Sequence, residues 1–412
     1  MKGINQKGIF PLRLIIRDCM TKKKGVSKED PSFIELVKSN FKKMDKLLLL
    51  ATVILIIVGT LSIVSASSRE TVVRYNYSMY YFFNKHLKIL LFSLVACIIA
   101  ILIPTKYYKI LGPVAFLGIT GLILSLFIIG SMKRGSQGWF SKGGQPSELA
   151  KPAIIVMIAL LFDYYNNYIR KKKPFNWVTY LIYFLLFGTV LPVITLMQGD
   201  MGTALLTVGI SGIMLLAGPV SKQTTKKCII SIIVLGIFGC FILEMARGYI
   251  FSSEQIERLT EFINPCSKYE DSGYQICNGF IAMNDGGLTG LGIGKSRQKY
   301  SYIPDPHTDS IFAVIIEETG LLTGTFILII YLLMIARILN ISSKTKNVRN
   351  RYISFGIAVY LFLHIVFNLG GLLGILPLTG VPLPLITYGG SFTLSFLLSL
   401  TIVQRICIES KN

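Results

Sequence analysis

Asp309 is the residue whose type and position point most directly to chemistry. It closes the segment 304–309, which reads Pro-Asp-Pro-His-Thr-Asp, and a long apolar run follows it. The two prolines restrict the backbone ahead of it. A carboxylate that is partly desolvated at the start of such a run can serve as a general base, because burial raises its pKa. Thr308 or Asp309 could instead cap a helix, and the spacing alone favours capping.

A glycine-rich basic stretch precedes this segment. Residues 285–299 read Asp-Gly-Gly-Leu-Thr-Gly-Leu-Gly-Ile-Gly-Lys-Ser-Arg-Gln-Lys, which places Lys295, Arg297 and Lys299 beside flexible backbone. Glycine-rich backbone with Lys and Arg can bind phosphate. A flexible basic loop beside lipid headgroups explains the pattern equally well, since the glycine spacing matches neither a Walker nor a dinucleotide motif.

Other charged residues fall within or beside apolar runs. Glu317 and Glu318 lie two turns into the run after Asp309, and a carboxylate buried there requires a polar partner or a cavity. Glu148 and Lys151, at i and i+3, can form an ion pair, for which a structural role is favoured over a catalytic one.

Several polar or irregular positions remain. Asp200 predicts a tight turn, and His364 and Asn368, one helical turn apart, are expected to make interhelical hydrogen bonds. Trp139 could anchor at the membrane interface or form an aromatic platform for a sugar or lipid. Residues 377–390 contain three prolines and three glycines, and irregular backbone at membrane depth predicts a groove near the outer face.

The composition identifies a membrane protein. Of 412 residues, 52% are hydrophobic and only 15% are charged, whereas soluble domains carry about 25% charged residues. Lys and Arg number 42 against 21 Asp and Glu, which gives a net charge of +21. On an apolar chain this excess indicates loops that face anionic membrane lipid, and it does not indicate nucleic acid. We therefore predict an all-α polytopic membrane protein.

Ten apolar runs are long enough to cross a hydrocarbon core, which takes about 20 helical residues. They lie near residues 46–66, 87–104, 110–130, 148–165, 177–197, 203–220, 228–246, 310–339, 352–373 and 389–408. Basic residues concentrate before residue 46 and in alternate connections, which predicts that both termini are cytoplasmic. The predicted parts are a basic tail (1–45), a transmembrane domain (46–408) with a large extracellular loop (247–309) before the eighth helix, and a cytoplasmic C-terminus (409–412).

The cysteines and histidines show no metal-binding spacing. Cys266 and Cys277 are the cysteines of the large loop, and a disulfide between them would contribute about 2–4 kcal/mol of stability. Both states stay open. Free thiols are favoured, because a reducing habitat would leave the pair unbridged.

Four motifs in one order carry a resemblance to a known family. They are Gly138-Trp139 with residues 145–151 (Gln-Pro-Ser-Glu-Leu-Ala-Lys), residues 199–204 (Gly-Asp-Met-Gly-Thr-Ala), residues 304–309, and residues 377–384 (Pro-Leu-Thr-Gly-Val-Pro-Leu-Pro) with 388–391 (Tyr-Gly-Gly-Ser). Together they resemble the shape, elongation, division and sporulation (SEDS) proteins, the FtsW/RodA family, over residues 44 to 408.

The resemblance implies a multi-pass enzyme of the bacterial cytoplasmic membrane that polymerises lipid II into glycan strands on the outer face, in cell division or elongation. It implies a class B penicillin-binding protein that cross-links the strands as a partner, together with other divisome or elongasome proteins. No cofactor is certain. A divalent cation, Mg²⁺ or Mn²⁺, could assist at the diphosphate, with Asp305 or His307 nearby.

The family's functional residues carry over to matching positions. Asp309 matches the catalytic aspartate, Arg258 the loop arginine and Trp139 the short-loop tryptophan, while Glu148 and Lys151 match the Glu-Leu-x-Lys element. The expected substrate-binding residues are Arg258, Lys295, Arg297, Trp139, Glu148, Lys151 and His307, with no metal ligand among them.

Two other functions stay open. A flippase for lipid-linked sugar would use the same basic groove and inward-facing polar residues such as Glu317 and Glu318. A non-catalytic scaffold would only activate its penicillin-binding partner. A base and cations on one face favour the enzyme. Asp305 stands where the family usually has Glu, and this departure leaves the base at Asp309 intact.

Overall fold

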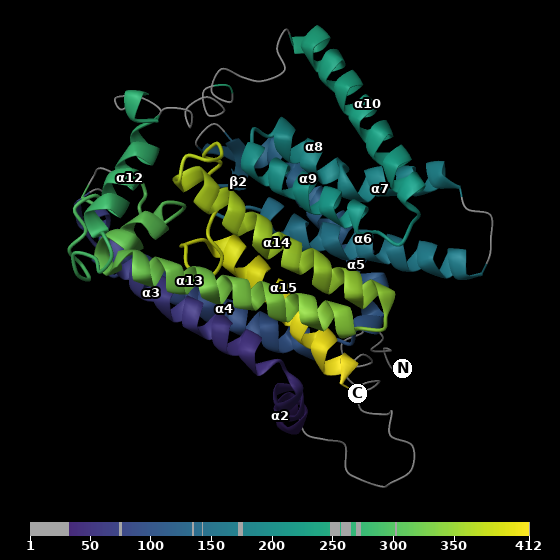
Figure 1. The fold of residues 1–412 in the computed structure, drawn as a ribbon, viewed down its shortest axis with the longest axis horizontal. Coiled ribbons are helices and arrows are strands. Elements are labelled where there is room, and N and C mark those ends of the chain that lie inside the picture. The colour runs from purple at the N-terminus through teal and green to yellow at the C-terminus, as the bar shows by residue number, and fades with distance from the viewer. Residues whose placement is uncertain are drawn as a thin grey trace, which may run out of the picture.

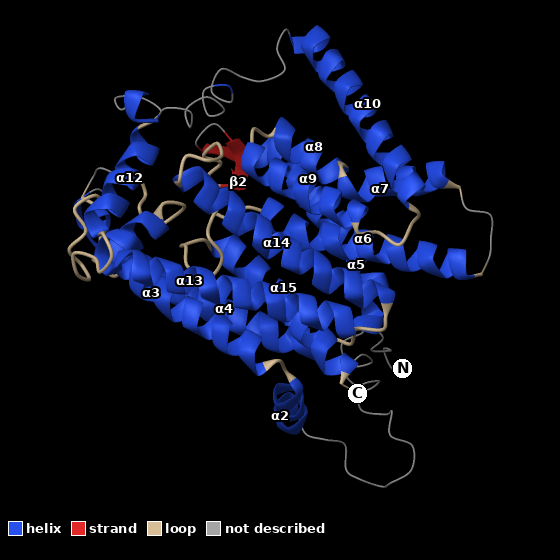
Figure 2. Cartoon of the chain, in the orientation of Figure 1, coloured by secondary structure: helices blue, strands red, loops and turns tan. Residues whose placement is uncertain are grey.

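The computed structural model describes residues 33–73, 76–133, 136–141, 143–171, 176–247, 256, 265–268, 273–300 and 303–411. Within them the protein is a bundle of long helices with one short hairpin (Figure 1 and Figure 2). The tail before residue 33 and much of the predicted large loop, Arg258 included, lie outside the described residues.

The elements follow one another in two groups along the chain. The first group comprises α2 (Phe33–Lys43), α3 (Lys46–Val73), α4 (Tyr81–Leu102), η1 (Thr105–Tyr107), α5 (Tyr108–Ile129), β1 (Gly130–Lys133), β2 (Ser136–Phe140), α6 (Ser147–Arg170), α7 (Trp177–Gly188) and α8 (Val190–Met197). The second comprises α9 (Met201–Leu216), α10 (Lys222–Arg247), η3 (Pro265–Lys268), α12 (Tyr274–Gly286), α13 (Ile311–Lys344), α14 (Val348–Leu372) and α15 (Gly390–Ser410).

Short polar side chains fix where several of these helices begin. Asn176, Asp200 and Asn347 precede α7, α9 and α14, and each side chain accepts a backbone N–H from the first turn. Such caps satisfy donors that the helix itself leaves without partners. The turn predicted at Asp200 is thus confirmed as the start of α9.

The predicted membrane runs all overlap helices, although the run at 177–197 is divided between α7 and α8. Among the described residues, seven helical stretches are long and apolar enough to cross a membrane: Lys46–Arg69, Tyr81–Leu102, Thr105–Ile129, Trp177–Met197, Ile311–Lys344, Val348–Leu372 and Gly390–Ser410. Helix α9, with 16 residues, is shorter. The polytopic helical fold is confirmed, whereas the number ten and the cytoplasmic side stay predictions.

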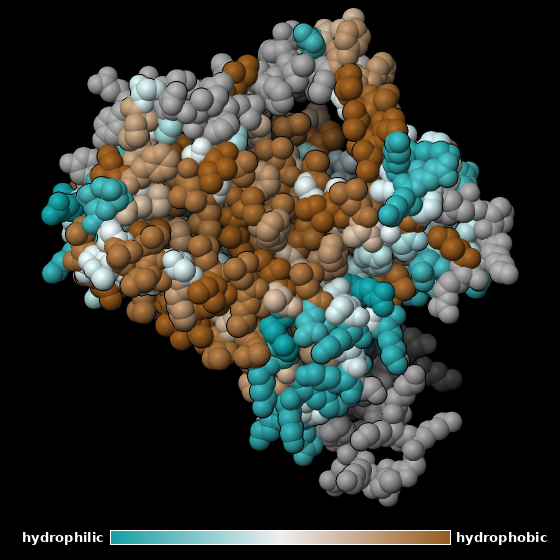
Figure 3. Space-filling view, in the orientation of Figure 1, coloured by the Kyte–Doolittle hydropathy of each residue, from teal (hydrophilic) through white to brown (hydrophobic). Residues whose placement is uncertain are grey.

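The surface of the bundle is apolar over most of the helices' length. Leu91 and Phe92 on α4 are each 64% exposed, and Ile128 on α5 is 87% exposed. Figure 3 shows this apolar surface across the middle of the molecule, with hydrophilic residues gathered around α2 and the C-terminus. Soluble proteins rarely leave apolar patches of this size exposed, so the surface is one that faces lipid.

Both ends of the described bundle meet on one side (Figure 1). Lys411 Nζ donates a hydrogen bond of 2.8 Å to the carbonyl oxygen of Lys43, the last residue of α2. The N–H of Asp45 donates to Gln404 Oε1 on α15, also at 2.8 Å. The start of the described bundle and its C-terminal end are therefore neighbours, while the cytoplasmic location of both termini stays a prediction.

Helix α13 is interrupted near its start. Gly320 has φ +82° and ψ 168°, and a Cβ there would lie 2.2 Å from the Leu288 carbonyl oxygen, so only glycine fits. Backbone hydrogen bonds join the segment 287–292 to the segment 317–322 on both sides of the break. The first turns of α13, residues 311–319, therefore form a separate unit held by the glycine-rich loop.

Glu317 receives its hydrogen bonds from that loop. Its Oε2 accepts from the Ser296 hydroxyl at 2.5 Å, and its Oε1 accepts from the N–H groups of Arg297 and Gln298 at 2.6 and 3.2 Å. The side chain is fully buried. The polar partners that the sequence required for this carboxylate are thus loop residues.

Glu318 is paired with a cation from the same loop. Lys299 Nζ lies 2.8 Å from Glu318 Oε1, and the Ser65 hydroxyl of α3 donates to the same carboxylate at 2.7 Å. Lys299 also donates to the carbonyl of Gly294 at 2.9 Å. Because Lys299 and Glu318 are 4% and 5% exposed, their mutual pairing is what permits their burial.

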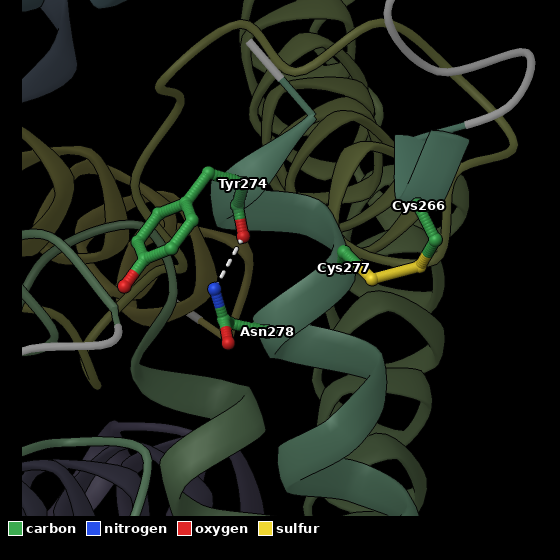
Figure 4. The surroundings of a disulfide bond; sticks show 4 residues. All are labelled: Cys266, Tyr274, Cys277 and Asn278. Carbon is green, nitrogen blue, oxygen red and sulfur yellow. Dashed lines mark hydrogen bonds between the residues drawn. A yellow bond between two sulfur atoms is a disulfide. The ribbon is translucent and has the colours of Figure 1, made fainter. Parts of the chain in front are cut away.

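The two cysteines of the predicted large loop are bonded to each other. A disulfide joins Cys266 of η3 to Cys277 of α12, and it ties the short 3₁₀ turn against the helix (Figure 4). Within α12, Asn278 Nδ2 donates to the carbonyl of Tyr274 at 2.8 Å. The free-thiol state that the sequence favoured is therefore wrong for this structure.

Candidate functional site

A cavity of about 970 Å³ has Trp139 of β2 in its wall, and Figure 1 shows β2 at the end of the bundle away from α2. Its wall comes from six parts of the chain: α4, the segment from β2 to the first turns of α6, the turn between α8 and α9, Gln275 of α12, the segment 304–309, and residues 378–394. These parts are distant in sequence. Their convergence confirms the groove that the irregular backbone of residues 377–390 predicted.

Asp309 lies in the wall of this cavity and is 5% exposed. Its Oδ1 lies 2.8 Å from the Thr308 hydroxyl, which can donate to it. Its Oδ2 lies next to Gly380, 3.7 Å from where a Cβ would stand on that glycine, and both residues line the cavity. Among the described residues, no hydrogen bond to Oδ2 is present, so one oxygen of a buried carboxylate points into the cavity.

The start of α13 makes no use of Asp309 as a cap. Ser310 precedes the first helical residue, and its side chain makes no capping hydrogen bond. The Thr308 hydroxyl lies 2.7 Å from the Asp305 carbonyl oxygen, away from the first turn of the helix. The capping role that spacing favoured is therefore wrong, because the tight turn at 305–308 directs both side chains away from the helix axis.

Asp305 occupies a backbone conformation that few side chains adopt. Its φ of +43° lies in the left-handed region, which Asp and Asn tolerate better than other non-glycine residues. It lines the cavity together with His307. The sequence departure at this position, Asp in place of the usual Glu, therefore suits the turn that presents Asp309.

Side-chain donors hold the segment after α14 in place. Its prolines have no N–H, and its carbonyl groups need partners from elsewhere. His364 Nδ1 lies 3.1 Å from the carbonyl oxygen of Pro382, and the Tyr331 hydroxyl donates to that of Pro384. The interhelical hydrogen bond expected of His364 is thus replaced by one to loop backbone.

Asn368 bridges the two loops that face each other across Asp309. Its Nδ2 donates at 2.8 Å to the carbonyl oxygen of Asp309 and at 2.8 Å to that of Val381. It is 3% exposed. The expected interhelical hydrogen bond of Asn368 is therefore replaced by two hydrogen bonds to loop carbonyl groups.

Glu148 and Lys151 form the predicted ion pair in the cavity wall. Lys151 Nζ lies 2.8 Å from both carboxylate oxygens, and the two side chains are 4% and 1% exposed. Lys151 also lies 5.8 Å from the centre of the Phe392 ring. The Ser395 hydroxyl of α15 donates to the Glu148 carbonyl at 2.7 Å, which fixes the start of α6 against α15.

Asp200 joins the turn at α9 to the segment before α6. Its Oδ2 accepts a hydrogen bond of 2.7 Å from Gln145 Nε2, while Oδ1 caps α9. The N–H of Gln145 donates to the Ser391 hydroxyl at 2.9 Å. Asp200 therefore has both a structural bond and a place in the cavity wall.

Aromatic side chains cover one side of the cavity. The His307 ring lies 4.2 Å from that of Phe82 on α4 and 5.6 Å from that of Tyr388. The N–H of Tyr388 donates to the His307 carbonyl at 3.0 Å. Burial raises the pKa of Tyr388, so its phenol stays protonated at neutral pH and can donate a hydrogen bond there.

Five of the eight predicted site residues line this cavity: Asp309, Glu148, Lys151, Trp139 and His307. Trp139 reaches it from β2, where it pairs with Ser131 of β1. Lys295 and Arg297 are exposed on the glycine-rich loop and do not line the cavity. Arg258 lies outside the described residues.

Lys88 lines the cavity but was not among the predicted site residues. It lies on α4 beside Ile89 and Phe92, and it makes no ion pair among the described residues. The signal was available, since a cation near the start of an apolar run points to a polar cavity or interface. Because Lys151 is neutralised by Glu148, Lys88 is the wall cation best placed to meet an anionic ligand.

Carboxylates outnumber cations in this wall. Its charged side chains are Glu148, Asp200, Asp305, Asp309, Lys88 and Lys151. In the described part of the chain, no three His, Cys, Asp or Glu side chains are grouped so as to hold a metal ion. The divalent cation stays a prediction.

The helical membrane bundle holds a buried carboxylate in the wall of a large cavity that also contains other charged side chains. These features define the class, a polytopic membrane protein with an enzyme-like site. The chain belongs to the FtsW, RodA and SpoVE family, described as "Cell cycle protein", whose model matches residues 45–412. The resemblance found in the motifs is confirmed. The protein is therefore a multi-pass protein of the bacterial cytoplasmic membrane.

Individual proteins agree with this assignment. The chain is 33% identical over 377 residues to "Probable peptidoglycan glycosyltransferase FtsW" of Coxiella burnetii, covering 89% of this chain and 97% of that protein. The crystal structure of the rod shape determining protein RodA of Thermus thermophilus matches with a TM-score of 0.64 at 20% identity, over 90% of this chain and 98% of that one. A structure described as "Structural coordination of polymerization and crosslinking by a peptidoglycan synthase complex" matches with a TM-score of 0.70 at 20% identity, over 89% and 98%. The two structural matches show a common fold.

Proposed function

We propose that this protein is a peptidoglycan glycosyltransferase that polymerises lipid II into glycan strands at the outer face of the cytoplasmic membrane, in cell division or elongation. Its family membership and the name of its Coxiella relative support this proposal. The observation that carries it is the carboxylate of Asp309, buried in a large cavity with one oxygen left open.

The chemistry requires a base and a leaving group. The acceptor sugar hydroxyl attacks the anomeric carbon of the donor, a glycosidic bond forms, and the bond to the polyprenyl diphosphate breaks. Asp309 Oδ2 accepts the hydroxyl proton as the bond forms. A positioned base of this kind typically contributes a factor of about 10² to 10⁴ in rate.

Cations then balance the charge that develops on the departing diphosphate. Lys88 is suited to this role by its position in the cavity wall beside apolar residues of α4. Arg258, Lys295 and Arg297, the predicted substrate-binding cations, would share this role if the glycine-rich loop meets the substrate. His307, Trp139 and the Glu148–Lys151 pair would bind the sugar and peptide portions.

We propose a class B penicillin-binding protein as the partner that cross-links the strands, together with other divisome or elongasome proteins. The similarity in fold to a chain of a peptidoglycan synthase complex supports such a pairing. Co-purification with the penicillin-binding protein encoded by the same bacterium, in the same detergent, tests this part separately from catalysis.

A lipid-linked-sugar flippase is the second candidate, and it would need Glu317 and Glu318 along a path through the membrane. Both carboxylates are instead bonded to the outer loop and to α3. This observation favours the enzyme over the transporter. A scaffold without activity predicts that Asp309→Asn is silent in cells.

Incubation of purified protein with labelled lipid II, with and without its penicillin-binding partner, tests the function. A ladder of glycan strands on a gel that is lost in Asp309→Asn supports a polymerase with this base. No ladder under any partner condition would refute it, and a liposome flipping assay would then test transport. Full activity in EDTA would show that the reaction does not require a divalent cation.

A further inference from the structure

We propose that Asn368 is the positioning residue that holds Asp309 in its reactive place, by binding the backbone of Asp309 and of the loop opposite it with a single carboxamide. The inference rests on the proposed function, because it assigns a role relative to the base of that reaction. Asn368 does not line the cavity.

The geometry of the carboxamide leaves it one orientation. Both N–H groups of Nδ2 are used, one on the Asp309 carbonyl and one on the Val381 carbonyl, each at 2.8 Å. Rotation of the amide by 180° would put its oxygen against two carbonyl oxygens. The assignment of nitrogen and oxygen thus follows from the acceptors, and the side chain is locked at 3% exposure.

The two carbonyls belong to the two loops that enclose the open oxygen of Asp309. Gly380, next to Val381, is the residue that Oδ2 faces, and it has a φ of +65°. A second link between the loops is the backbone hydrogen bond from Tyr388 to His307. Asn368 is therefore the side chain that sets the separation between Asp309 and the loop across from it.

The bond from Asn368 is the one hydrogen bond to the Asp309 backbone itself among the described residues. It precedes the helix and receives no bond from the helix cap, and its carboxylate is bonded only to the adjacent Thr308 among the described residues. The facing segment has prolines at 377, 382 and 384 and cannot donate from those positions. Without Asn368, both loops would relax and the base would move relative to the acceptor hydroxyl.

Asn368→Ala removes both donors, and Asn368→Ser keeps a single hydroxyl donor. Tyr331→Phe is the matched control, since it also removes a buried donor to a carbonyl of the same segment, at Pro384, but does not touch Asp309. A misplacement of about 1 Å can cost about 10²-fold in rate. We expect kcat to fall by about that factor in Asn368→Ala, by less in Asn368→Ser, and to stay near the wild-type value in Tyr331→Phe, with KM for lipid II unchanged in all three.

Asn368→Asp provides a readout that a loss of packing alone does not move. A second carboxylate beside Asp309 disfavours the charged form of both, so the acidic limb of the pH–rate profile should shift to higher pH. The rate of carbodiimide labelling at Asp309, followed by peptide mass spectrometry, reports the same shift without any polymerisation assay. It therefore separates this inference from the proposed function.

Three results would count against the positioning role of Asn368. A wild-type ladder with full kcat in Asn368→Ala, or an equal loss in Tyr331→Phe, would overturn the positioning role while leaving the polymerase intact. If Asn368→Ala fails to fold, Asn368→Ser and the labelling profile of Asn368→Asp decide the matter. An unshifted labelling profile in Asn368→Asp also counts against the inference.

Discussion

Asp309 and Glu318 are both 5% exposed carboxylates, and they stand at opposite ends of the first segment of α13. Glu318 is held by Lys299 and Ser65, and its neighbour Glu317 by a hydroxyl and two backbone N–H groups. Asp309 has one hydroxyl neighbour and an oxygen that faces a cavity. A buried carboxylate is thus structural where its hydrogen bonds are complete and available for chemistry where they are not.

The Glu148–Lys151 pair stands between these two cases. Lys151 Nζ donates to both carboxylate oxygens of Glu148, so the two charges neutralise each other, yet both residues line the cavity. A closed pair in a cavity wall can orient a ligand while keeping its own charges balanced. Removing either partner would leave the other buried without compensation.

The largest effect is expected at the open carboxylate. Asp309→Asn should lower the initial rate of lipid II polymerisation by a factor of about 10² to 10⁴, because the amide cannot accept the proton. The thermal unfolding midpoint in detergent should stay within roughly a degree or two of wild type, since the substitution keeps the shape of the side chain and breaks no ion pair. A marked fall in the midpoint would show that Asp309, like Glu318, is a structural carboxylate.

At the ion pair of Lys299 with Glu318, the expected effect of substitution is on stability. Lys299→Met leaves the Glu318 carboxylate buried without its cation and should cost about 3–5 kcal/mol of stability. Chemical unfolding in detergent measures the loss. The double variant Lys299→Met with Glu318→Gln removes both charges and should recover part of it, and a single variant as stable as wild type would contradict the assignment.

The disulfide is expected to have a smaller effect on the outer loop. Alkylation followed by mass spectrometry should label Cys266 and Cys277 only after reduction. The double variant Cys266→Ser with Cys277→Ser should lose about 2–4 kcal/mol, since the cross-link no longer restricts the unfolded chain. Labelling of both thiols without reductant would show that the loop is held without the bond.

The smallest effect is expected at the far end of α13, where Asp45 pairs with Arg337 at 2.5 Å. Burial raises the pKa of Asp45, but the hydrogen bonds from Arg337 and the Leu48 N–H outweigh it, so the net pKa lies below the ordinary value. The pair should contribute about 1 kcal/mol or less, because Arg337 is one-third exposed and water screens it.

The sign of this contribution follows from the lowered pKa. The stabilisation is present above the unfolded-state pKa of about 3.9 and is lost as pH falls through the lower folded-state value. Thermal midpoints of wild type and Asp45→Asn, measured from pH 7 down to pH 3, should therefore converge at the acidic end. A constant difference across that range would mean that Asp45 acts only as a neutral hydrogen-bond acceptor.

Much of the fold was predictable from the sequence because its cause is local. Apolar runs of about 20 residues become membrane helices whatever they pack against, and short polar residues such as Asp200 begin helices through their own side chains. The motifs also named Asp309, Glu148, Lys151, Trp139 and His307, all of which line the cavity. These residues are marked by types that an apolar chain carries only where it needs them.

Other features were not predictable because they depend on which segments meet. Spacing favoured Asp309 as a cap, but the turn at 305–308 directs its side chain into the cavity. His364 and Asn368 were expected to join helices, and they bind loop carbonyls that prolines leave without partners. Lys88 near the start of an apolar run indicated a polar cavity or an interface, but only the structure shows that it lines the cavity.

By itself, then, the sequence determined that this is a polytopic helical membrane protein of one family, with its candidate chemistry concentrated at a few polar positions. Only the tertiary structure shows that Glu317 and Glu318 have hydrogen-bond partners on both sides, whereas one oxygen of Asp309 has none among the described residues. The physical reason is that burial, hydrogen bonding and charge pairing arise from segments up to hundreds of residues apart, as when Ser65 meets Glu318 or Asn368 meets Asp309. Residue type sets what a side chain can do, and its three-dimensional partners set whether it is left able to do it.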